Sequence, residues 1–217
     1  RSKTVMIHNG IDTLAFQPSR SREVVREELE LPREAPVVGT VGQLVPWKRQ
    51  DVFIEAAAHV LARESDARFL VVGADMFGEH PEYVEELRET ARSFGLGERI
   101  TFTGFREDIA SVISALDVMV HPADDEPLGR VVLEAMSLGV PCVAVDSCGP
   151  SEIIEAAKLM SSEVVLSWWT LTAGTACPGG LLRVLSSFSP ARTGRSGWAP
   201  RRAGASTSGS APSAWPA

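Results

Sequence analysis

The chain alternates short apolar runs with longer segments in which apolar residues recur at helical spacing. Continuous apolar runs rich in Val and Ile are typical of strands in a parallel sheet that is covered on both faces. Strands that alternate with helices at this spacing produce such a sheet. The sequence therefore predicts an α/β fold with a doubly wound, Rossmann-like parallel sheet. The predicted strands are Val37–Val41, Arg68–Val72, Ile100–Thr103 and Asp117–Val120, with a short first strand over Lys3–His8.

Helices are expected between these strands. Ligands of doubly wound sheets bind outside the carboxyl ends of the strands, so functional residues are expected in the loops that enter the helices. The first helix covers Arg22–Leu31, with Ser19 or Ser21 as its N-cap and Pro32 as its stop. The later helices cover about residues 49–62, a segment with Tyr83, Leu87, Ala91 and Phe94 on one face that ends at Gly95, and a short segment with Ile109, Val112, Ile113 and Leu116.

The stretch from Asp124 to Gly139 places two carboxylates, Glu126 and Glu134, eight residues apart. Gly129 marks a helix start, so Glu126 falls on a loop and Glu134 on the helix. A helix N-terminus favours an anion, which suits a phosphate at this position. The spacing alone leaves a second interpretation open. In it, Glu126 is a helix-start acid stabilised by the helix dipole, and Glu134 is a solvated surface residue.

The segment EPLGRVVLEAMSLGVPCVA, from Glu126 to Ala144, resembles the acid-x7-acid signature of the retaining glycosyltransferases of family four, or glycosyl transferase group 1. This resemblance implies the C-terminal, donor-binding half of a GT-B fold, in which two Rossmann-like halves face each other across a cleft. Further segments resemble the family in the same order, so that about residues 4–156 are covered. They are VMIHNGIDTLAFQP at Val5–Pro18, VGQLVPWKRQD at Val41–Asp51, FLVVGAD at Phe69–Asp75, ITFTGFRED at Ile100–Asp108 and CGPSEII at Cys148–Ile154.

The resemblance implies a role for each candidate residue. Glu126 would hold hydroxyls of the transferred sugar beside its anomeric carbon, and Glu134 would hold the ribose hydroxyls. Lys48 would neutralise the diphosphate leaving group, with help from the backbone amides of Gly129 and Arg130. Glu126 and Lys48 are therefore the predicted catalytic residues. The predicted donor-binding residues are Gly42, Gln43, Phe105, Arg106, Leu128, Gly129, Arg130 and Glu134.

Two positions of the loop after the strand Val37–Val41 need comment. Gln43 stands where many family members carry Arg, and a neutral amide lacks the charge-assisted hydrogen bonds of a guanidinium. Weaker donor binding or slower turnover is expected in consequence. Lys48 has a second interpretation as a solvated lysine, although a helix start is an unfavourable place for a cation.

Two further residues carry open alternatives. In the family, the loop that corresponds to Phe105 and Arg106 lies against the nucleotide base mostly through backbone groups. The side chain of Arg106 is therefore interpreted as half of a surface ion pair with Asp108 or Glu107. His121 precedes a Pro at a strand end, where a lone His is usually structural, and the His implicated in catalysis in the family belongs to the other half.

The run Asp124-Asp125-Glu126 could be taken for a magnesium site, because Mg²⁺ prefers oxygen ligands. The resemblance implies instead a metal-independent reaction without a cofactor, in which basic residues replace the metal ion. It implies a UDP-, GDP- or ADP-sugar as donor. The acceptor stays open among saccharides, lipids and small molecules.

The charge balance limits the partners. The net charge is −7, whereas nucleic-acid binding needs a basic face, so a nucleic-acid partner is excluded. The three Cys residues have neither metal-ligand spacing nor an even number, which predicts a reducing, cytoplasmic location. No apolar run reaches the roughly 18 residues of a transmembrane helix. Any association with the inner membrane would come through the missing N-terminal half.

The resemblance stops near Ala156, and the composition changes soon after. Residues 164–217 contain five Arg and no Asp or Glu, a charge of +5 that leaves −12 for the rest of the chain. We therefore divide the chain into a nucleotide-sugar-binding domain over residues 1–160 and an atypical low-complexity basic tail over residues 161–217. A reading-frame change is the preferred explanation of the tail, and a genuine segment that binds an acidic partner is the alternative. Only Val164–Leu171 is apolar enough to form a strand.

The predicted function is that of a glycosyltransferase donor half, which transfers a sugar from a nucleotide-diphospho-sugar with retention of anomeric configuration. The chain opens on Arg1 without a Met, which fits a fragment. The alternative is a noncatalytic nucleotide-sugar-binding module, inert alone or dependent on a separate acceptor half. A GT-B epimerase or phosphorylase is a third interpretation.

Overall fold

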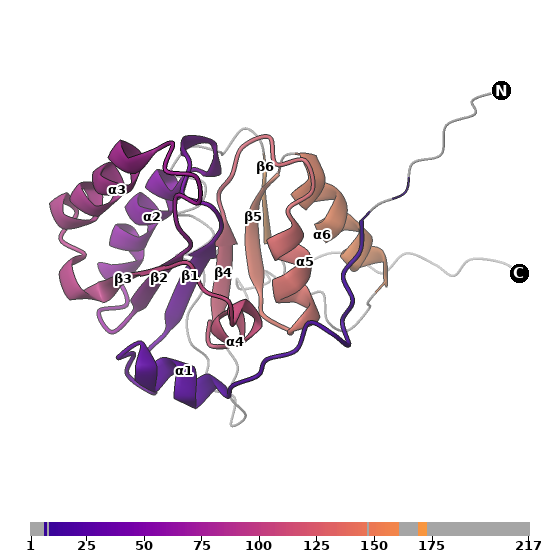
Figure 1. The fold of residues 1–217 in the computed structure, drawn as a ribbon, viewed down its shortest axis with the longest axis horizontal. Coiled ribbons are helices and arrows are strands. Elements are labelled where there is room, and N and C mark those ends of the chain that lie inside the picture. The colour runs from indigo at the N-terminus through magenta and orange to yellow at the C-terminus, as the bar shows by residue number, and fades with distance from the viewer. Residues whose placement is uncertain (1–6, 8, 147, 161–168, 173–217) are drawn as a thin grey trace, which may run out of the picture.

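The computed structural model describes residues 7, 9–146, 148–160 and 169–172, which form a six-stranded sheet flanked by helices (Figure 1). The strand order is β3-β2-β1-β4-β5-β6, and every pairing between these strands is parallel. The chain therefore winds outward in both directions from β1 and β4, and the predicted fold class is confirmed. The strands are β1 (Val37–Val41), β2 (Arg68–Val72), β3 (Ile100–Gly104), β4 (Val118–His121), β5 (Cys142–Asp146) and β6 (Trp169–Thr172).

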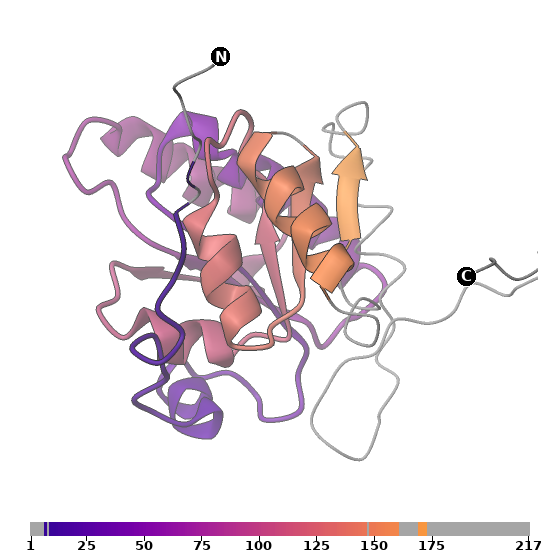
Figure 2. The ribbon, with the colours of Figure 1, turned by 90° about the vertical axis from the view of Figure 1, so that its right-hand side faces the viewer.

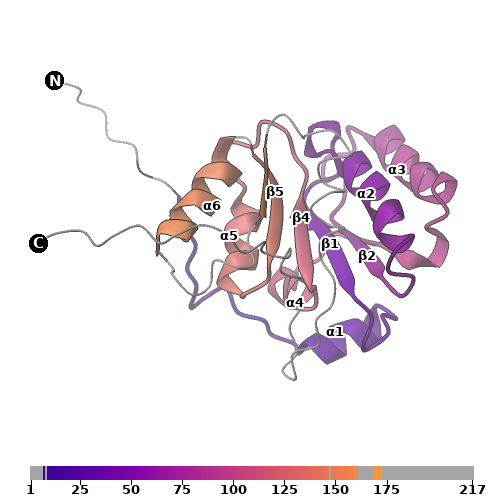
Figure 3. The ribbon, with the colours of Figure 1, turned by 180° about the vertical axis from the view of Figure 1, so that it is seen from behind.

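Helices cover both faces of the sheet (Figures 1 and 3). Residues of α2 and α3 form the apolar core on one face, and residues of α1, α4, α5 and α6 contribute to the core on the other. The helices are α1 (Arg22–Glu28), α2 (Gln50–Leu61), α3 (Pro81–Ser93), α4 (Ile109–Ser114), α5 (Arg130–Ser137) and α6 (Cys148–Met160), with short 3-10 turns η1 (Pro46–Lys48) and η2 (Gly97–Arg99).

The strand β2 shows how the sheet divides the core. Phe69 and Val71 pack with α2 and α3, whereas Leu70 and Val72 pack in the cluster on the opposite face. Successive residues of a strand point to opposite faces, so a strand buried on both faces is apolar at most positions, with Thr40 of β1 and His121 of β4 as buried polar exceptions. This is why the buried strands appear in the sequence as continuous apolar runs.

The sequence predicted most element boundaries closely. The bounds of β1 and β2 agree residue for residue, β3 ends one residue later than predicted, and β4 is shifted by one residue at both ends. The helix predicted over Arg22–Leu31 ends earlier, at Glu28, because the chain turns there and Glu30 takes the left-handed conformation with φ 54°. The strand predicted over Lys3–His8 lies outside the described residues apart from Ile7, which is not in a strand.

Within the predicted tail, only the last strand is described. β6 pairs with β5 from Val143↔Trp169 to Asp146↔Thr172 and so extends the sheet (Figure 2). It overlaps the stretch that was predicted to be apolar enough for a strand. The rest of the tail lies outside the described residues. Across the part of the chain that is described, no helix has the length and apolar character to cross a membrane, and the cytoplasmic location stays a prediction.

Glycines at the carboxyl ends of β1, β2 and β3 bring these strand ends together. The Gly73 N–H donates to the Gly104 carbonyl at 3.0 Å, and the Gly42 N–H donates to the Val72 carbonyl at 3.0 Å. A Cβ at Gly73 would lie 1.9 Å from the Gly42 carbonyl oxygen, and Gly73 has φ +136°. Only a residue without a side chain permits this approach, which sets the start of the loop that carries Lys48.

Candidate functional site

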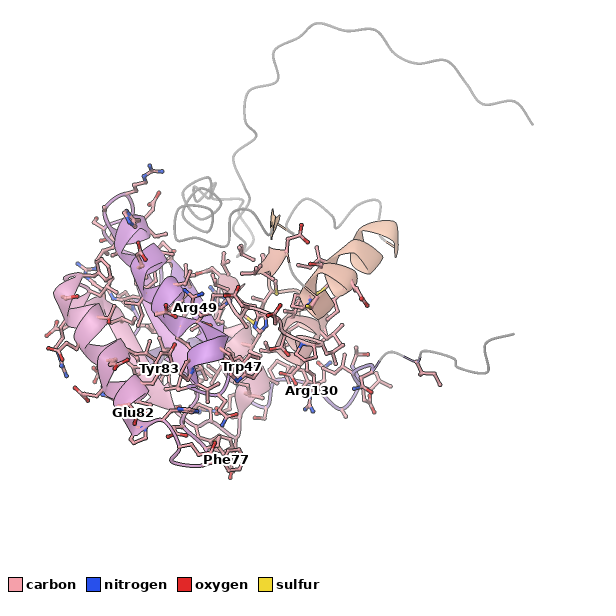
Figure 4. All side chains as sticks on the ribbon, turned by 90° about the horizontal axis from the view of Figure 1, so that it is seen from above. Trp47, Arg49, Phe77, Glu82, Tyr83 and Arg130 are labelled. Carbon is pink, nitrogen blue, oxygen red and sulfur yellow. The ribbon has the colours of Figure 1, made fainter. Side chains whose placement is uncertain are left out.

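The predicted site residues lie on the loops that follow β1, β3 and β4 and on α5, and the loops after β1 and β4 run along the upper edge of Figure 1. Figure 4 looks onto this edge from above. It shows Trp47 and Arg49 of the loop after β1 and Arg130 at the start of α5 on the same side of the molecule, together with Phe77 of the loop after β2. The edge of the sheet therefore gathers loops that are far apart in the sequence.

Glu126 stands at the centre of the site. Its Oε1 accepts a hydrogen bond of 3.1 Å from the Gly129 N–H, and its Oε2 forms an ion pair with the Lys48 Nζ. The residue is 8% exposed although it lies on a loop. Two of the predicted donor-site residues are thus in direct contact across loops that are 78 positions apart.

The electrostatic surroundings of Glu126 favour its ionised form. The His121 imidazole, the Lys48 ammonium and the Gly129 N–H together hold the pKa of Glu126 at about 2, against the opposite effect of burial. The Lys48 contact is direct, whereas the His121 Nε2 lies 3.5 Å from Glu126 Oε2. We therefore regard the ammonium as the stronger of the two side-chain partners. Glu126 is an anion throughout the neutral pH range.

The loop that carries Glu126 is fixed by close backbone packing. The Gly149 N–H at the start of α6 donates to the Glu126 carbonyl at 3.0 Å. A Cβ at Gly149 would lie 2.4 Å from the Cα of Leu128, so no larger residue fits there. Gly129 itself has φ +76°, which suits the entry into α5. The backbone of Leu128 therefore lies directly against the start of α6.

The loop after β1 is tied to the loop after β4 by a second ion pair. Arg49, in the left-handed conformation with φ 52°, contacts Asp51 and places its NH1 2.8 Å from Asp124 Oδ2. The Lys48 ammonium also lies 4.2 Å from the centroid of the Trp47 ring. The Arg49 contact thus holds the loop that carries Lys48 against the loop that carries Asp124.

A buried amide holds the beginning of the same loop. The Gln50 side chain is 2% exposed, and its Nε2 donates to the Gln43 carbonyl at 2.9 Å. Its Oε1 accepts a hydrogen bond of 3.2 Å from the Tyr83 hydroxyl, and burial raises the pKa of Tyr83 to about 12. The position of Gln43 is thus set from α2 and α3, which the sequence pattern gave no reason to expect.

Glu134 lies on α5 and is also 8% exposed. Its Oε1 accepts a 3.0 Å hydrogen bond from Arg130 Nε one turn earlier. The alternative interpretation of Glu134 as a solvated surface residue is therefore wrong. The alternative for Glu126 as a helix-start acid describes one of its contacts, the bond from Gly129, and leaves out the ion pair with Lys48.

Arg106 forms its ion pairs with carboxylates other than Glu126 and Glu134. Its guanidinium donates twice to Asp108 at 2.8 Å and once to Glu28 of α1 at 2.6 Å, which raises its pKa. Arg20 contacts the same two carboxylates and closes a ring of four charges. The predicted ion pair with Asp108 is confirmed. Phe105 is left 58% exposed at the end of β3.

Several residues that shape the site were not predicted from the sequence. Arg49 and Gln50 lie in the segment VGQLVPWKRQD but were given no role, and Arg20 and Glu28 lie in no motif. Arg49 and Asp124 are 75 positions apart, so they become neighbours only through the sheet topology. The acidic run Asp124-Asp125-Glu126 spreads over different partners. Among the residues that the structure describes, no group of three or more His, Cys, Asp or Glu could hold a metal ion.

Comparison with known proteins decides the family. A family model described as glycosyl transferases group 1 matches residues 21–165. The chain belongs to this family. As a group 1 glycosyl transferase domain, it is 35% identical over 151 residues to the lipopolysaccharide core biosynthesis mannosyltransferase LpsB of Rhizobium meliloti (strain 1021). That match covers 70% of this chain and 42% of the relative, so the chain spans less than half of the relative's length.

Solved structures of this family share the fold. Anabaena HepE in complex with UDP has a TM-score of 0.70 and 31% identity, and its complex with UDP-glucose has 0.69 and 32%. Each likeness covers 83% of this chain and 46% of that one. The C-terminal domain of a group 1 glycosyl transferase from Francisella tularensis has a TM-score of 0.57 at 22% identity, over 82% of this chain and 97% of that domain. These likenesses confirm the predicted Rossmann-like half of a GT-B fold.

Proposed function

We propose that this chain is the C-terminal, donor-binding half of a retaining glycosyltransferase that uses a nucleotide-diphospho-sugar. The observation that carries the proposal is the buried contact between Lys48 and Glu126 at the start of α5. It places a cation, a carboxylate and a helix N-terminus together outside the carboxyl ends of β1 and β4, where ligands of doubly wound sheets bind. A diphosphate needs the cation and the helix start, and a sugar needs the carboxylate.

Each residue then has a separate task. Lys48 and the first amides of α5 stabilise the negative charge that develops on the departing diphosphate, which is the main catalytic contribution of this half. Glu126 accepts hydrogen bonds from hydroxyls of the transferred sugar. Glu134, held by Arg130, accepts hydrogen bonds from the ribose, and the loop at Phe105 contacts the base. The reaction requires no metal ion, because the basic groups balance the diphosphate charge.

Similarities to other proteins support the proposal. HepE, which shares 31% identity, binds UDP, and its further complex contains UDP-glucose. The isolated domain from Francisella tularensis is a C-terminal one and matches this chain over almost all of its own length. The acceptor would be bound by the other half, and we make no choice among saccharide, lipid and small-molecule acceptors.

A noncatalytic nucleotide-sugar-binding module is the second candidate. The observation in its favour is that the contacts between Lys48, Glu126 and Gly129 account for donor binding and identify no acceptor contact in the described part of the chain. The two candidates share the donor site and differ only in turnover. Hydrolysis or transfer of the sugar by the chain alone would exclude the noncatalytic module, and donor binding without turnover would favour it.

The test is calorimetric titration of the chain with UDP, GDP and ADP and with their common sugar conjugates, first without metal and then with Mg²⁺. We expect one nucleotide and its sugar conjugate to bind without metal, which would also identify the base. Absence of binding to every nucleotide would contradict the proposed function. Binding that depends on Mg²⁺ would contradict the metal-independent site and leave the donor class standing.

A further inference from the structure

The His121 side chain faces the donor site without a hydrogen-bond partner for its Nε2. The residue ends β4 and is 2% exposed. Within the described part of the chain, this nitrogen is buried and unpaired, and the nearest carboxylate oxygen is Glu126 Oε2 at 3.5 Å. Buried polar atoms are nearly always paired, so an unpaired imidazole nitrogen beside a carboxylate requires an explanation.

The geometry around Glu126 explains why the His121 Nε2 has no hydrogen-bond partner there. Its Oε2 faces both Lys48 and His121, and Lys48 is the closer of the two. Lys48 reaches Glu126 from a flexible side chain on the loop after β1, whereas His121 is held in the sheet by burial. The carboxylate therefore has one movable partner and one fixed partner.

We propose that His121 is a positioning residue, which holds Glu126 for the sugar when Lys48 turns from Glu126 to the donor diphosphate. This inference rests on the proposed function of the site. A single ammonium cannot keep the short contact with Glu126 and neutralise the diphosphate equally well. Once Lys48 turns away, a buried carboxylate would lose its main partner, which is strongly unfavourable unless another donor replaces it. A His121 N–H on Nε2 is the donor already in place.

The contact between Lys48 and Glu126 thus keeps the ligand-free site neutral. The movement required of His121 or Glu126 is small, because their separation of 3.5 Å already approaches the hydrogen-bond range. The Gly129 N–H keeps its bond to the other oxygen of Glu126, so the carboxylate pivots on Oε1. The two ends of the donor are then recognised by different groups, Lys48 for the diphosphate and Glu126 with His121 for the sugar.

A matched pair of variants tests this role. Gln and Met have nearly the same shape, and Gln carries an amide N–H at about the place of the His Nε2, whereas Met has no donor. We would titrate the parent chain, His121→Gln and His121→Met with UDP and with UDP-glucose. His59→Met, an exposed position on α2, controls for loss of a histidine elsewhere.

The expected result is a selective loss. His121→Met should keep the parent affinity for UDP and lose about tenfold in affinity for UDP-glucose, the size expected for one hydrogen bond to a charged group. His121→Gln should retain most of the affinity for the sugar conjugate. An equal loss for UDP and UDP-glucose, or no loss for either, would overturn the positioning role. A parent chain that binds GDP or ADP in place of UDP is titrated with that nucleotide and its sugar conjugate, and a parent chain that binds none of the three contradicts the proposed function instead.

A measurement without ligand tests the role of His121 when the parent chain binds no nucleotide. We would measure by urea unfolding a double-mutant cycle of His121→Met and Glu126→Gln, once in the parent chain and once in Lys48→Met. Each cycle gives the coupling between the two side chains in that background. We expect the coupling, expressed as a ratio of unfolding equilibrium constants, to be about fivefold larger when the ammonium is absent. Equal coupling in both backgrounds would show that His121 does not take over Glu126.

Discussion

Glu126 lies where its ionisation affects folding and, in the proposed donor site, the binding of the sugar. It is buried, it accepts from Gly129, and it faces Lys48 and His121. A carboxylate with these partners is stabilised as an anion in the folded chain and loses them on unfolding. Its contribution to stability must therefore depend on pH.

The direction of this dependence follows from the sign of the pKa shift. The pKa falls from 4.5 to about 2 on folding, so the contribution is complete above pH 4.5 and is lost as the pH falls toward 2. Glu126→Gln should lower the free energy of unfolding at neutral pH, and the difference from the parent should shrink over that window. Urea unfolding at several pH values measures it. Glu85→Gln on the exposed face of α3 is the control, and a difference that stays constant with pH would contradict the assignment.

Lys48 provides the second prediction at the scale of one residue. Lys48→Met keeps the apolar stem and removes the charge that would meet the diphosphate. Affinity for UDP should fall about 10- to 100-fold, as expected for a charge-assisted hydrogen bond, while affinity for uridine should change less than about twofold. Calorimetry measures both ligands. Arg92→Met on the exposed face of α3 is the control, and equal losses for UDP and uridine would exclude a diphosphate contact.

At the scale of elements, α1 is joined to the sheet by buried charges. Arg26 of α1 places its NH2 2.8 Å from Asp117 Oδ2 and also donates to the Ala115 and Ala35 carbonyls, each at 3.0 Å. The same Asp117 oxygen accepts from the Val37 N–H at 2.8 Å. One carboxylate thus connects α1, the start of β1 and the residue before β4.

Asp117→Ala should therefore destabilise the fold strongly. It leaves the Arg26 guanidinium, 5% exposed, without its counter-charge, and the expected loss is about 3–5 kcal/mol in the free energy of unfolding. The double variant with Arg26→Met should lose less than the sum of the two single losses, because the buried guanidinium is then absent and Arg22, the other partner of Asp117, is 29% exposed. Urea unfolding tests both. Glu85 forms an exposed ion pair with Arg92, so its removal should lower the free energy of unfolding by less than about 1 kcal/mol. A similarly small loss for Asp117→Ala would contradict the importance of the buried pair with Arg26.

The sequence predicted the strands better than the ion pairs between residues that are far apart along the chain. Strands β1 and β2 were predictable because nearly all residues of a strand buried on both faces are apolar, which is a local property, with Thr40 and Arg68 as the exceptions here. The pairing of Lys48 with Glu126 was predicted only as membership of one site, through the family resemblance. Arg26 and Asp117 are 91 positions apart, and nothing in either neighbourhood marks them as partners. Helix ends such as that of α1 depend on a single φ angle, which composition does not fix.

At the scale of the molecule, the net charge of the chain and the charge needed at the proposed site differ in sign. The chain carries a net charge of −7, yet the proposed ligand is an anion. Lys48, Arg49 and Arg130 gather on the carboxyl edge of the sheet, where Figure 4 shows Arg49 and Arg130. Lys48 and Arg49 are there offset by Glu126 and Asp124. Arg130 is likewise paired with Glu134, so this edge is no basic face, and the positive charge proposed to meet a phosphate belongs to single side chains and to the first amides of α5.

The end of the sheet gives the last prediction. β6 covers the outer edge of β5 along four paired residues, from Trp169 to Thr172. A chain that ends at Met160 would leave the apolar strand β5 as an exposed edge, which is prone to pair with another molecule. A chain that ends at Thr172 would keep this pairing.

We therefore expect the chain that ends at Met160 to be less stable than the chain that ends at Thr172. Its free energy of unfolding, measured with urea, should be lower by roughly 1–3 kcal/mol, the net value of a few hydrogen bonds and the associated packing. It should also self-associate in sedimentation experiments. The full chain is the reference for both. Equal stability and equal mass for the two shortened chains would mean that β6 contributes nothing to the domain, and the domain boundary predicted after residue 160 would then stand. A loss confined to the shorter chain would move that boundary beyond Thr172, because a strand that stabilises the sheet belongs to the domain.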